Sequence, residues 1–303
     1  MPHTAGIALI EAPSELGLRG SGVRLLPEAL RRMGLLDALT GVDWAGRVDP
    51  PAGSVQRDPA SGVLNVTSIA AFSRELASKL RAQLERRRFS LVLGGDCSVL
   101  IGVALALRRR GRYGLAFLDG HADFYSPAAE PSGEVASMEL AVITGGEPAA
   151  LADIDGLRPF LLEEDVVLLG TRDLEAALEE GSPDVRQTAM RVFDLETVRR
   201  WGAGRAAHRA VQVLSTPERD GFWIHLDADV LDDRIMPAVD YRLPGGLTSD
   251  ELTEALAVLL SSPRAVGMTL TIYNPEQDDD SLSAGRVLVR AVRAAFGAAP
   301  VIA

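Results

Sequence analysis

The stretch Asp119-Gly120-His121-Ala122-Asp123 carries most of the information about fold and site. It follows an apolar run over residues 113–118, which predicts a buried strand. Three side chains that can bind a metal then occur at every second position, and this spacing on an extended strand end directs all three to one side. Carboxylates combined with one imidazole suit a divalent ion such as Mn²⁺. The stretch therefore predicts a metal site at the end of a strand.

A second cluster, His225-Leu226-Asp227-Ala228-Asp229, follows the apolar residues 221–224 and has the same layout. Two such strands side by side would offer five or six ligands, which is more than one metal needs. This indicates a two-metal site that activates a water. Each cluster alone could equally be a solvated strand end or a set of helix N-caps. Two clusters at the carboxyl ends of apolar strands favour the metal, since ligands of open α/β sheets bind there.

The composition of the 303 residues excludes several classes of protein. A formal net charge of -11 argues against a nucleic-acid surface. No apolar run reaches the roughly 18 residues of a membrane span. The single cysteine, Cys97, excludes an intrachain disulfide and fits a reducing compartment, so we expect a cytoplasmic protein. Residues 1–4 have no basic or long apolar segment, so we expect no signal peptide.

Strands and helices are predicted to alternate along the whole chain, which is typical of one parallel sheet covered on both faces. The predicted strands cover residues 6–10, 44–48, 91–93, 113–118, 166–169, 191–193, 221–224 and 265–273. The predicted helices begin at Pro27 and cover residues 68–88, 99–107, 137–144, 194–214, 252–260 and 281–296. Thr248-Ser249-Asp250-Glu251 forms a capping box before one of them. Because no repeat or linker interrupts this pattern, we expect a single domain over residues 1–303.

Three segments resemble the metal signatures of the arginase/agmatinase family of ureohydrolases: Gly94-Gly95-Asp96-Cys97-Ser98, Asp119 to Asp123, and Asp227 to Asp232. Ser132-Gly133, Gly245-Gly246-Leu247-Thr248 and Asn274-Pro275 resemble further family segments, so the resemblance spans residues 20–275. It implies a three-layer α/β/α sandwich with a mostly parallel eight-stranded sheet. It also implies two Mn²⁺ ions bridged by a hydroxide and a homo-oligomer, either a trimer or a hexamer.

The resemblance also assigns roles to individual residues. Asp119 and Asp227 would bridge both ions. Cys97 and Asp123 would complete one ion's shell, and His121 and Asp229 the other's. Asp123 would in addition act in catalysis, by holding the hydroxide that attacks the trigonal carbon of a guanidinium or amidine group.

One departure from the family pattern concerns the metal. The family usually has histidine at the position of Cys97. A thiolate is a soft ligand that favours Zn²⁺ or Fe²⁺ over Mn²⁺, so these ions are alternatives to the expected Mn²⁺. Cys97 could also be a small buried apolar residue that binds no metal.

Other departures concern catalysis and the substrate. Ala136 stands where the family has a proton-shuttling histidine. Ile272 stands where arginases and agmatinases have the glutamate that binds the guanidinium, and Glu276 could replace it only if the register slips. Tyr125 stands where arginase has an asparagine that holds the amino-acid head. Candidate substrate-binding residues are therefore Tyr125, Ser132, Tyr241 and Ile272.

These observations predict a metal-dependent hydrolase that cleaves a linear, non-peptide C–N bond of a small amidine, guanidino or ureido compound. Without the guanidinium-binding carboxylate, arginine and agmatine are not the expected substrates. The alternative, favoured by Ala136 and Ile272, is a metal-binding relative with little catalytic activity. The related metal-dependent deacetylases fit less well, because they typically hold one catalytic zinc.

Overall fold

The computed structural model describes residues 6–298. The expectation that the first four residues form no signal peptide lies outside these residues. Within the described part of the chain, no helix has both the length and the apolar character needed to cross a membrane.

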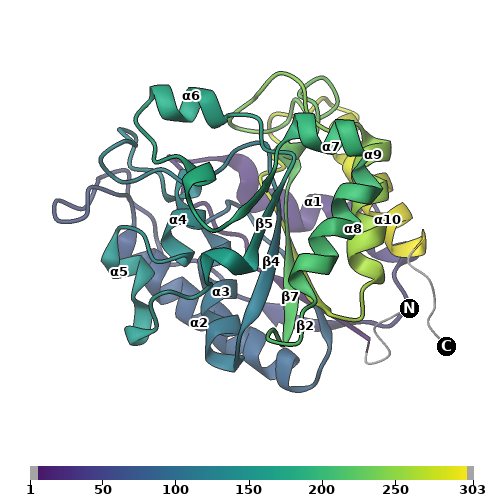
Figure 1. Cartoon of the computed structure of the whole chain (residues 1–303), viewed down its shortest axis with the longest axis horizontal. Coiled ribbons are helices and arrows are strands. Elements are labelled where there is room, and N and C mark those ends of the chain that lie inside the picture. The colour runs from purple at the N-terminus through teal and green to yellow at the C-terminus, as the bar shows by residue number, and fades with distance from the viewer. Residues whose placement is uncertain (1–5, 299–303) are drawn as a thin grey trace.

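One eight-stranded sheet forms the centre of the molecule (Figure 1). Its strands are β1 (Ile7–Glu11), β2 (Val42–Arg47), β3 (Phe89–Leu93), β4 (Tyr113–Leu118), β5 (Val166–Leu169), β6 (Arg191–Phe193), β7 (Gly221–Asp227) and β8 (Ala265–Thr271). Their order is β2-β1-β3-β8-β7-β4-β5-β6, and every neighbouring pair is parallel. The predicted parallel sheet is therefore confirmed.

Helices cover both faces of the sheet, which gives the predicted three layers (Figure 1). One face carries α2 (Val66–Glu85), α3 (Val99–Arg110), α4 (Glu139–Ile143) and α5 (Ala149–Ala152), and the other carries α1 (Leu26–Arg32), α8 (Ala203–Leu214), α9 (Ser249–Ser261) and α10 (Ser283–Ala298). The remaining helices are α6 (Leu174–Glu179) and α7 (Leu195–Trp201). Each face has its own apolar core, because the central strands are buried on both sides.

Some elements differ in extent from the prediction, and the following two break where the backbone takes a positive φ. The helix predicted over residues 194–214 is in fact two helices, α7 and α8, which meet at Gly202 with φ of 87°. The strand predicted over residues 265–273 ends at Thr271, since the next residue, Ile272, has φ of 71°. The capping box of Thr248 and Glu251 is confirmed at the start of α9.

The register of the central strands positions the two acidic clusters. Leu118 of β4 pairs with Leu226 of β7. Asp119 and Asp227 come one residue later, Asp227 as the last residue of β7, so the two acids lie at the same level and at the same end of the sheet. The loop after β3 reaches this edge too, because Gly94 N donates to Leu270 O on β8 at 2.9 Å. Three distant parts of the sequence thus meet at the carboxyl ends of β3, β7 and β4.

Candidate metal centre

The segment after β4 is a turn and not an extended strand end. The Asp119 carboxylate accepts a hydrogen bond from His121 N at 2.7 Å, which folds the chain back on itself. Asp123 has φ of 44°, a conformation that is uncommon for residues other than glycine. The expectation that alternation along a strand would align Asp119, His121 and Asp123 is therefore wrong in its geometry. Their side chains converge because the backbone turns.

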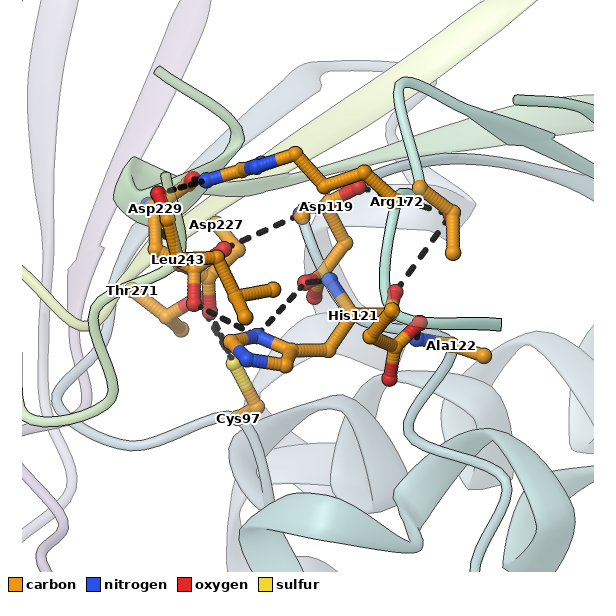
Figure 2. A network of polar contacts seen from close by, with 12 residues as sticks. Cys97, Asp119, His121, Ala122, Arg172, Asp227, Asp229, Leu243 and Thr271 are labelled. Carbon is orange, nitrogen blue, oxygen red and sulfur yellow. Dashed lines mark hydrogen bonds and ion pairs between the residues drawn. The ribbon is translucent and has the colours of Figure 1, made fainter. Parts of the chain in front are cut away.

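Asp227 and Asp229 hold the segment at the end of β7 against this turn (Figure 2). Asp227 is the last residue of β7, and its Oδ1 accepts from Asp229 N at 2.7 Å. Asp229 Oδ1 accepts from Gly120 N at 3.0 Å, and its Oδ2 lies 2.9 Å from His121 Nδ1. The ligand atoms of Asp119, His121 and Asp229 all lie within 4.8 Å of one another. These three side chains form a first group that could hold a metal.

The loop after β3 is shaped so that Cys97 faces the acids. A Cβ added at Gly95 would lie 1.8 Å from Ser14 O, so only glycine fits there. The buried Asp96 carboxylate accepts from Gly17 N at 3.2 Å and from Ser98 N at 2.8 Å, which fixes the loop. The thiol of Cys97 then donates to Asp227 Oδ2 at 2.8 Å (Figure 2).

A second possible ligand group surrounds Cys97. It contains Cys97, Asp119, Glu139 and His225, whose ligand atoms also lie within 4.8 Å of one another. All four side chains are buried. Asp119 belongs to both groups, as expected for a carboxylate that would bridge two ions. Asp123 and Asp227 belong to neither group by this distance, although Asp227 touches Cys97 and Asp229.

Burial and mutual repulsion dominate the protonation of this centre. Burial, together with the charges of Asp123 and Asp227, raises the pKa of Asp119 well above its usual value. Burial also raises the pKa of the Cys97 thiol. Burial would lower the pKa of His121, but the charge of Asp229 and the hydrogen bond to it outweigh this effect and raise the pKa to about 9. Without a cation, the centre therefore holds protons that its acids would normally release.

The residues present fit divalent cations. Several buried ligand atoms have no hydrogen-bond partner among the described residues, namely Asp119 Oδ2, both carboxylate oxygens of Glu139, and both ring nitrogens of His225. Burial lowers the pKa of His225 to about 3, so its imidazole is neutral and able to bind a metal. Unpaired buried carboxylates are costly, and cations would compensate them.

A cavity of about 690 Å³ opens above the centre. The predicted metal ligands His121, Asp123, Asp227 and Asp229 line it, whereas Cys97 and Asp119 are buried and lie outside its lining. The four candidate substrate residues also line it: Tyr125, Ser132, Tyr241 and Ile272. The structure therefore places all the predicted site residues in or directly around one site.

The substrate candidates lie at different places in this cavity. Ile272 N donates to Gly95 O at 2.7 Å, which holds this apolar side chain beside the Cys97 loop. Tyr125 and Tyr241 donate through their hydroxyls to the carboxylates of Glu180 and Glu134.

Two other residues considered from the sequence, Ala136 and Glu276, can be placed relative to the cavity. Ala136 lines the cavity, so no side chain at that position offers a proton relay. Glu276 is not part of the cavity lining and borders a separate depression beside Asp240 and Asn274. Glu276 therefore does not supply the missing carboxylate to this cavity.

Sequence reasoning missed Glu139, and it quoted His225 in the second cluster without giving it a role. Glu139 is the first residue of α4, where an acid is the ordinary complement to the helix dipole. His225 lies within β7, and its ring stacks on that of Phe117 with centroids 5.0 Å apart. The position of His225 two residues before Asp227, in the same cluster, could have indicated a metal ligand. The sequence contains no such indication for Glu139, because the burial of this side chain depends on how α4 packs.

A parallel α/β sheet that carries two linked groups of acid, imidazole and thiol ligands beneath a cavity is typical of metal-dependent hydrolases. Comparison with known proteins agrees with this class. The sequence model of the arginase family matches residues 5–297, and the chain belongs to this family.

The arginase of Staphylococcus aureus strain COL is 30% identical over 293 residues, which are 94% of this chain and 95% of that protein. The arginase of Bacillus caldovelox is 30% identical over 298 residues, covering 96% of this chain and 98% of that one. The native crystal structure of the Bacillus caldovelox arginase superposes with a TM-score of 0.86 at 28% identity and covers 96% of this chain and 98% of that chain. This protein is thus an arginase-family hydrolase, and the family implies a binuclear metal site.

Proposed function

We propose that this protein hydrolyses a linear, non-peptide C–N bond of a small amidine, guanidino or ureido compound other than arginine or agmatine. The observation that carries the proposal is the pair of ligand groups that share Asp119 below a cavity. In this proposal Cys97, Asp119, His121, Asp123, Asp227 and Asp229 hold two divalent ions within one domain over residues 1–303. Mn²⁺ is the family's metal, and Zn²⁺ or Fe²⁺ are alternatives because of the Cys97 thiol.

Bound divalent ions would supply the activated water that this hydrolysis needs. The protein's own residues would orient it. Asp123, with φ of 44° and in the cavity lining, would accept a hydrogen bond from the attacking water. Ile272 would present an apolar wall to the reacting group and leave the N–H groups of a guanidinium without an acceptor. The reacting end of the substrate should therefore carry little positive charge, as in a ureido or weakly basic amidine group.

Four further acids in the cavity lining favour a cationic group at the other end of the substrate. They are Glu130, Glu134, Glu180 and Asp240. Their carboxylates accept hydrogen bonds from neutral donors such as Ser137, Tyr241, Tyr125 and Ser21. Within residues 6–298 no salt bridge neutralises these four acids, and the lining's Arg242 is paired with Asp233. An ammonium group would be attracted here, and the α-carboxylate of arginine would be repelled.

A substrate panel tests this proposal. Purified protein is loaded in turn with Mn²⁺, Zn²⁺ or Fe²⁺ and incubated with arginine, agmatine, and ureido and amidino compounds with and without a terminal ammonium group. Release of ammonia, urea or free amine is measured. We expect turnover of a ureido or amidino compound with an ammonium tail. Turnover restricted to arginine would contradict the proposal.

The second candidate is a metal-binding member of the family with little catalytic activity. The observation that favours it is the pair Ala136 and Ile272, both in the cavity lining in place of a proton relay and a guanidinium acceptor. Tight metal binding without hydrolysis of any compound in the panel would favour this candidate.

The proposal includes a homo-oligomer, a trimer or hexamer, which rests on the family resemblance, and a cytoplasmic location, where a lone thiol stays reduced. Light scattering on the metal-loaded protein tests the first point. A monomer at micromolar concentration would contradict it.

A further inference from the structure

The Cys97 side of the centre contains two potential ligands that the family pattern does not assign, Glu139 and His225. Together with Cys97 and Asp119 they offer one sulfur, one nitrogen and two carboxylate groups within 4.8 Å of one another. A tetrahedral ion with protein ligands at 2.0–2.3 Å separates its ligand atoms by about 3.3–3.8 Å. The 4.8 Å limit exceeds this separation by about 1 Å, so the four side chains would move together by that much or less to surround a single ion.

Glu139 is buried with nothing to compensate its charge. It is 0% exposed, and neither carboxylate oxygen accepts a hydrogen bond from an N–H or O–H group of the described residues. The polar groups within its reach are its own backbone N–H and another acid, Asp123. Either a cation or a proton shared between these two acids must satisfy Glu139, because an isolated buried carboxylate is strongly unfavourable.

His225 is also unsatisfied. It is 0% exposed, and neither Nδ1 nor Nε2 has a hydrogen-bond partner among the described residues. Its ring stacks on Phe117 at an interplanar angle of 17°, which fixes the plane in which a nitrogen lone pair points. A purely structural histidine normally finds a partner for at least one ring nitrogen.

We propose that Glu139 and His225 join Cys97 and Asp119 as ligands of the metal position beside Cys97, in place of the Asp123 and Asp227 that the family resemblance assigns there, and that this position holds a thiophilic, four-coordinate ion such as Zn²⁺. The inference rests on the proposed metal centre but concerns ligands that the family resemblance does not supply. A thiolate in place of the family's histidine gives this position a softer ligand, which favours softer metal ions. Glu139 and His225 complete a set of sulfur, nitrogen and oxygen ligands of the kind that binds zinc. The position formed by His121 and Asp229 keeps the harder ligands that suit Mn²⁺.

Cobalt spectroscopy tests this inference without relying on activity. Metal-free full-length protein is titrated with Co²⁺, and the thiolate-to-cobalt charge-transfer band and the visible d–d bands are recorded with the metal content. We expect the wild type to show the charge-transfer band with intense, four-coordinate d–d bands. Cys97→Ser should abolish the band. Glu139→Gln and His225→Phe, which keeps the ring stack on Phe117, should each weaken Co²⁺ binding at this position by about tenfold or more and change the d–d bands.

Two further variants make the test specific. Glu139→Asp keeps the charge, and we expect it to restore part of the affinity lost in Glu139→Gln. Glu28→Gln also alters an acid in the first turn of a helix, but a half-exposed one, and should leave the spectra unchanged. Circular dichroism melts verify that each variant is folded.

Each contrary outcome has a distinct meaning. If the wild type binds no metal, the proposed function itself is wrong. If it binds two ions and Glu139→Gln keeps both the band and the affinity, Glu139 only shares a proton with Asp123 and the inference is wrong. An unchanged spectrum in His225→Phe would overturn the assignment of His225, and a wild type without the charge-transfer band would overturn the whole Cys97 position.

Discussion

The thiol of Cys97 donates a hydrogen bond to Asp227 Oδ2 across 2.8 Å, although the two residues follow strands that are not neighbours in the sheet. Cys97 follows β3, Asp227 ends β7, and β8 lies between them. The contact forms because both chain segments bend over the end of β8, where Thr271 Oγ1 lies 3.2 Å from the same sulfur. A cation that binds here would replace the thiol proton, so metal binding should release protons.

We expect two divalent ions per chain in the wild type and at most one in Asp227→Ala. Asp227 touches both Cys97 and Asp229, so its loss affects both positions. Metal analysis after dialysis gives the ratio. Glu85→Gln, which alters an exposed acid on α2, is the control and should retain two ions. A wild type that holds one ion or none after careful reconstitution would contradict the two-metal proposal.

Cys97→His should shift the metal preference from Zn²⁺ towards Mn²⁺. It replaces a soft thiolate by the imidazole that the family uses at this position. We expect the ratio of bound Mn²⁺ to bound Zn²⁺ in competition dialysis to rise by at least about tenfold, since even changes outside the ligand shell alter metal affinity by about 10–100-fold. Cys97→Ser serves as the comparison. An unchanged ratio in Cys97→His would mean that the sulfur does not bind metal.

Arginine and agmatine should be poor substrates of the wild type. Leaving a guanidinium unpaired against Ile272 costs on the order of 2–5 kcal/mol, and the lack of a proton relay at Ala136 costs a further ~10²-fold in rate. The double replacement Ile272→Glu with Ala136→His should therefore raise guanidine hydrolysis, measured as urea release. Ile272→Leu keeps an apolar wall and should give no gain. A wild-type turnover of either compound near ~10 s⁻¹ would contradict this prediction.

The metal-free protein should become less stable as pH rises from about 6.5 to 9. His121 is protonated up to about pH 9 in the folded state, so its stabilising pairing with Asp229 is complete below its unfolded pKa near 6.5 and is lost by about 9. The loss of this pairing alone lowers the free energy of unfolding by about 3 kcal/mol. The raised pKa values of Asp119 and Asp227 act in the same direction. The lowered pKa of His225, about 3, changes the stability only below pH 6.5, which is outside this range.

Thermal melts of chelated protein across this range provide the measurement. We expect the melting temperature to fall by roughly 6 °C or more, and His121→Asn should remove part of the fall. Protein loaded with metal should not follow this trend, because cations take the place of the protons and bind more strongly at higher pH. A melting temperature of the chelated protein that rises with pH would contradict the assigned protonation states.

The sequence contained enough to predict the fold. The apolar runs over 113–118 and 166–169 and the capping box at Thr248 correspond to β4, β5 and the start of α9. These signals are local, because strand periodicity and helix capping depend on residues that are close in the chain. The break at Gly202 follows a local signal too, because glycine commonly ends helices, but the break at Ile272 was not predictable in this way. An isoleucine gives no local reason to enter the left-handed region, so surrounding contacts must impose that conformation.

For the metal centre, the sequence by itself determined which chemical groups follow β3, β4 and β7, and the parallel sheet brings those strand ends to one edge. Only the tertiary structure decided how the groups meet. The turn at Asp123 replaces simple alternation, and the packing of α4 buries Glu139 beside Cys97, 42 positions away in the chain. Burial and the lack of a hydrogen-bond partner depend on distant neighbours, so a local pattern does not encode them.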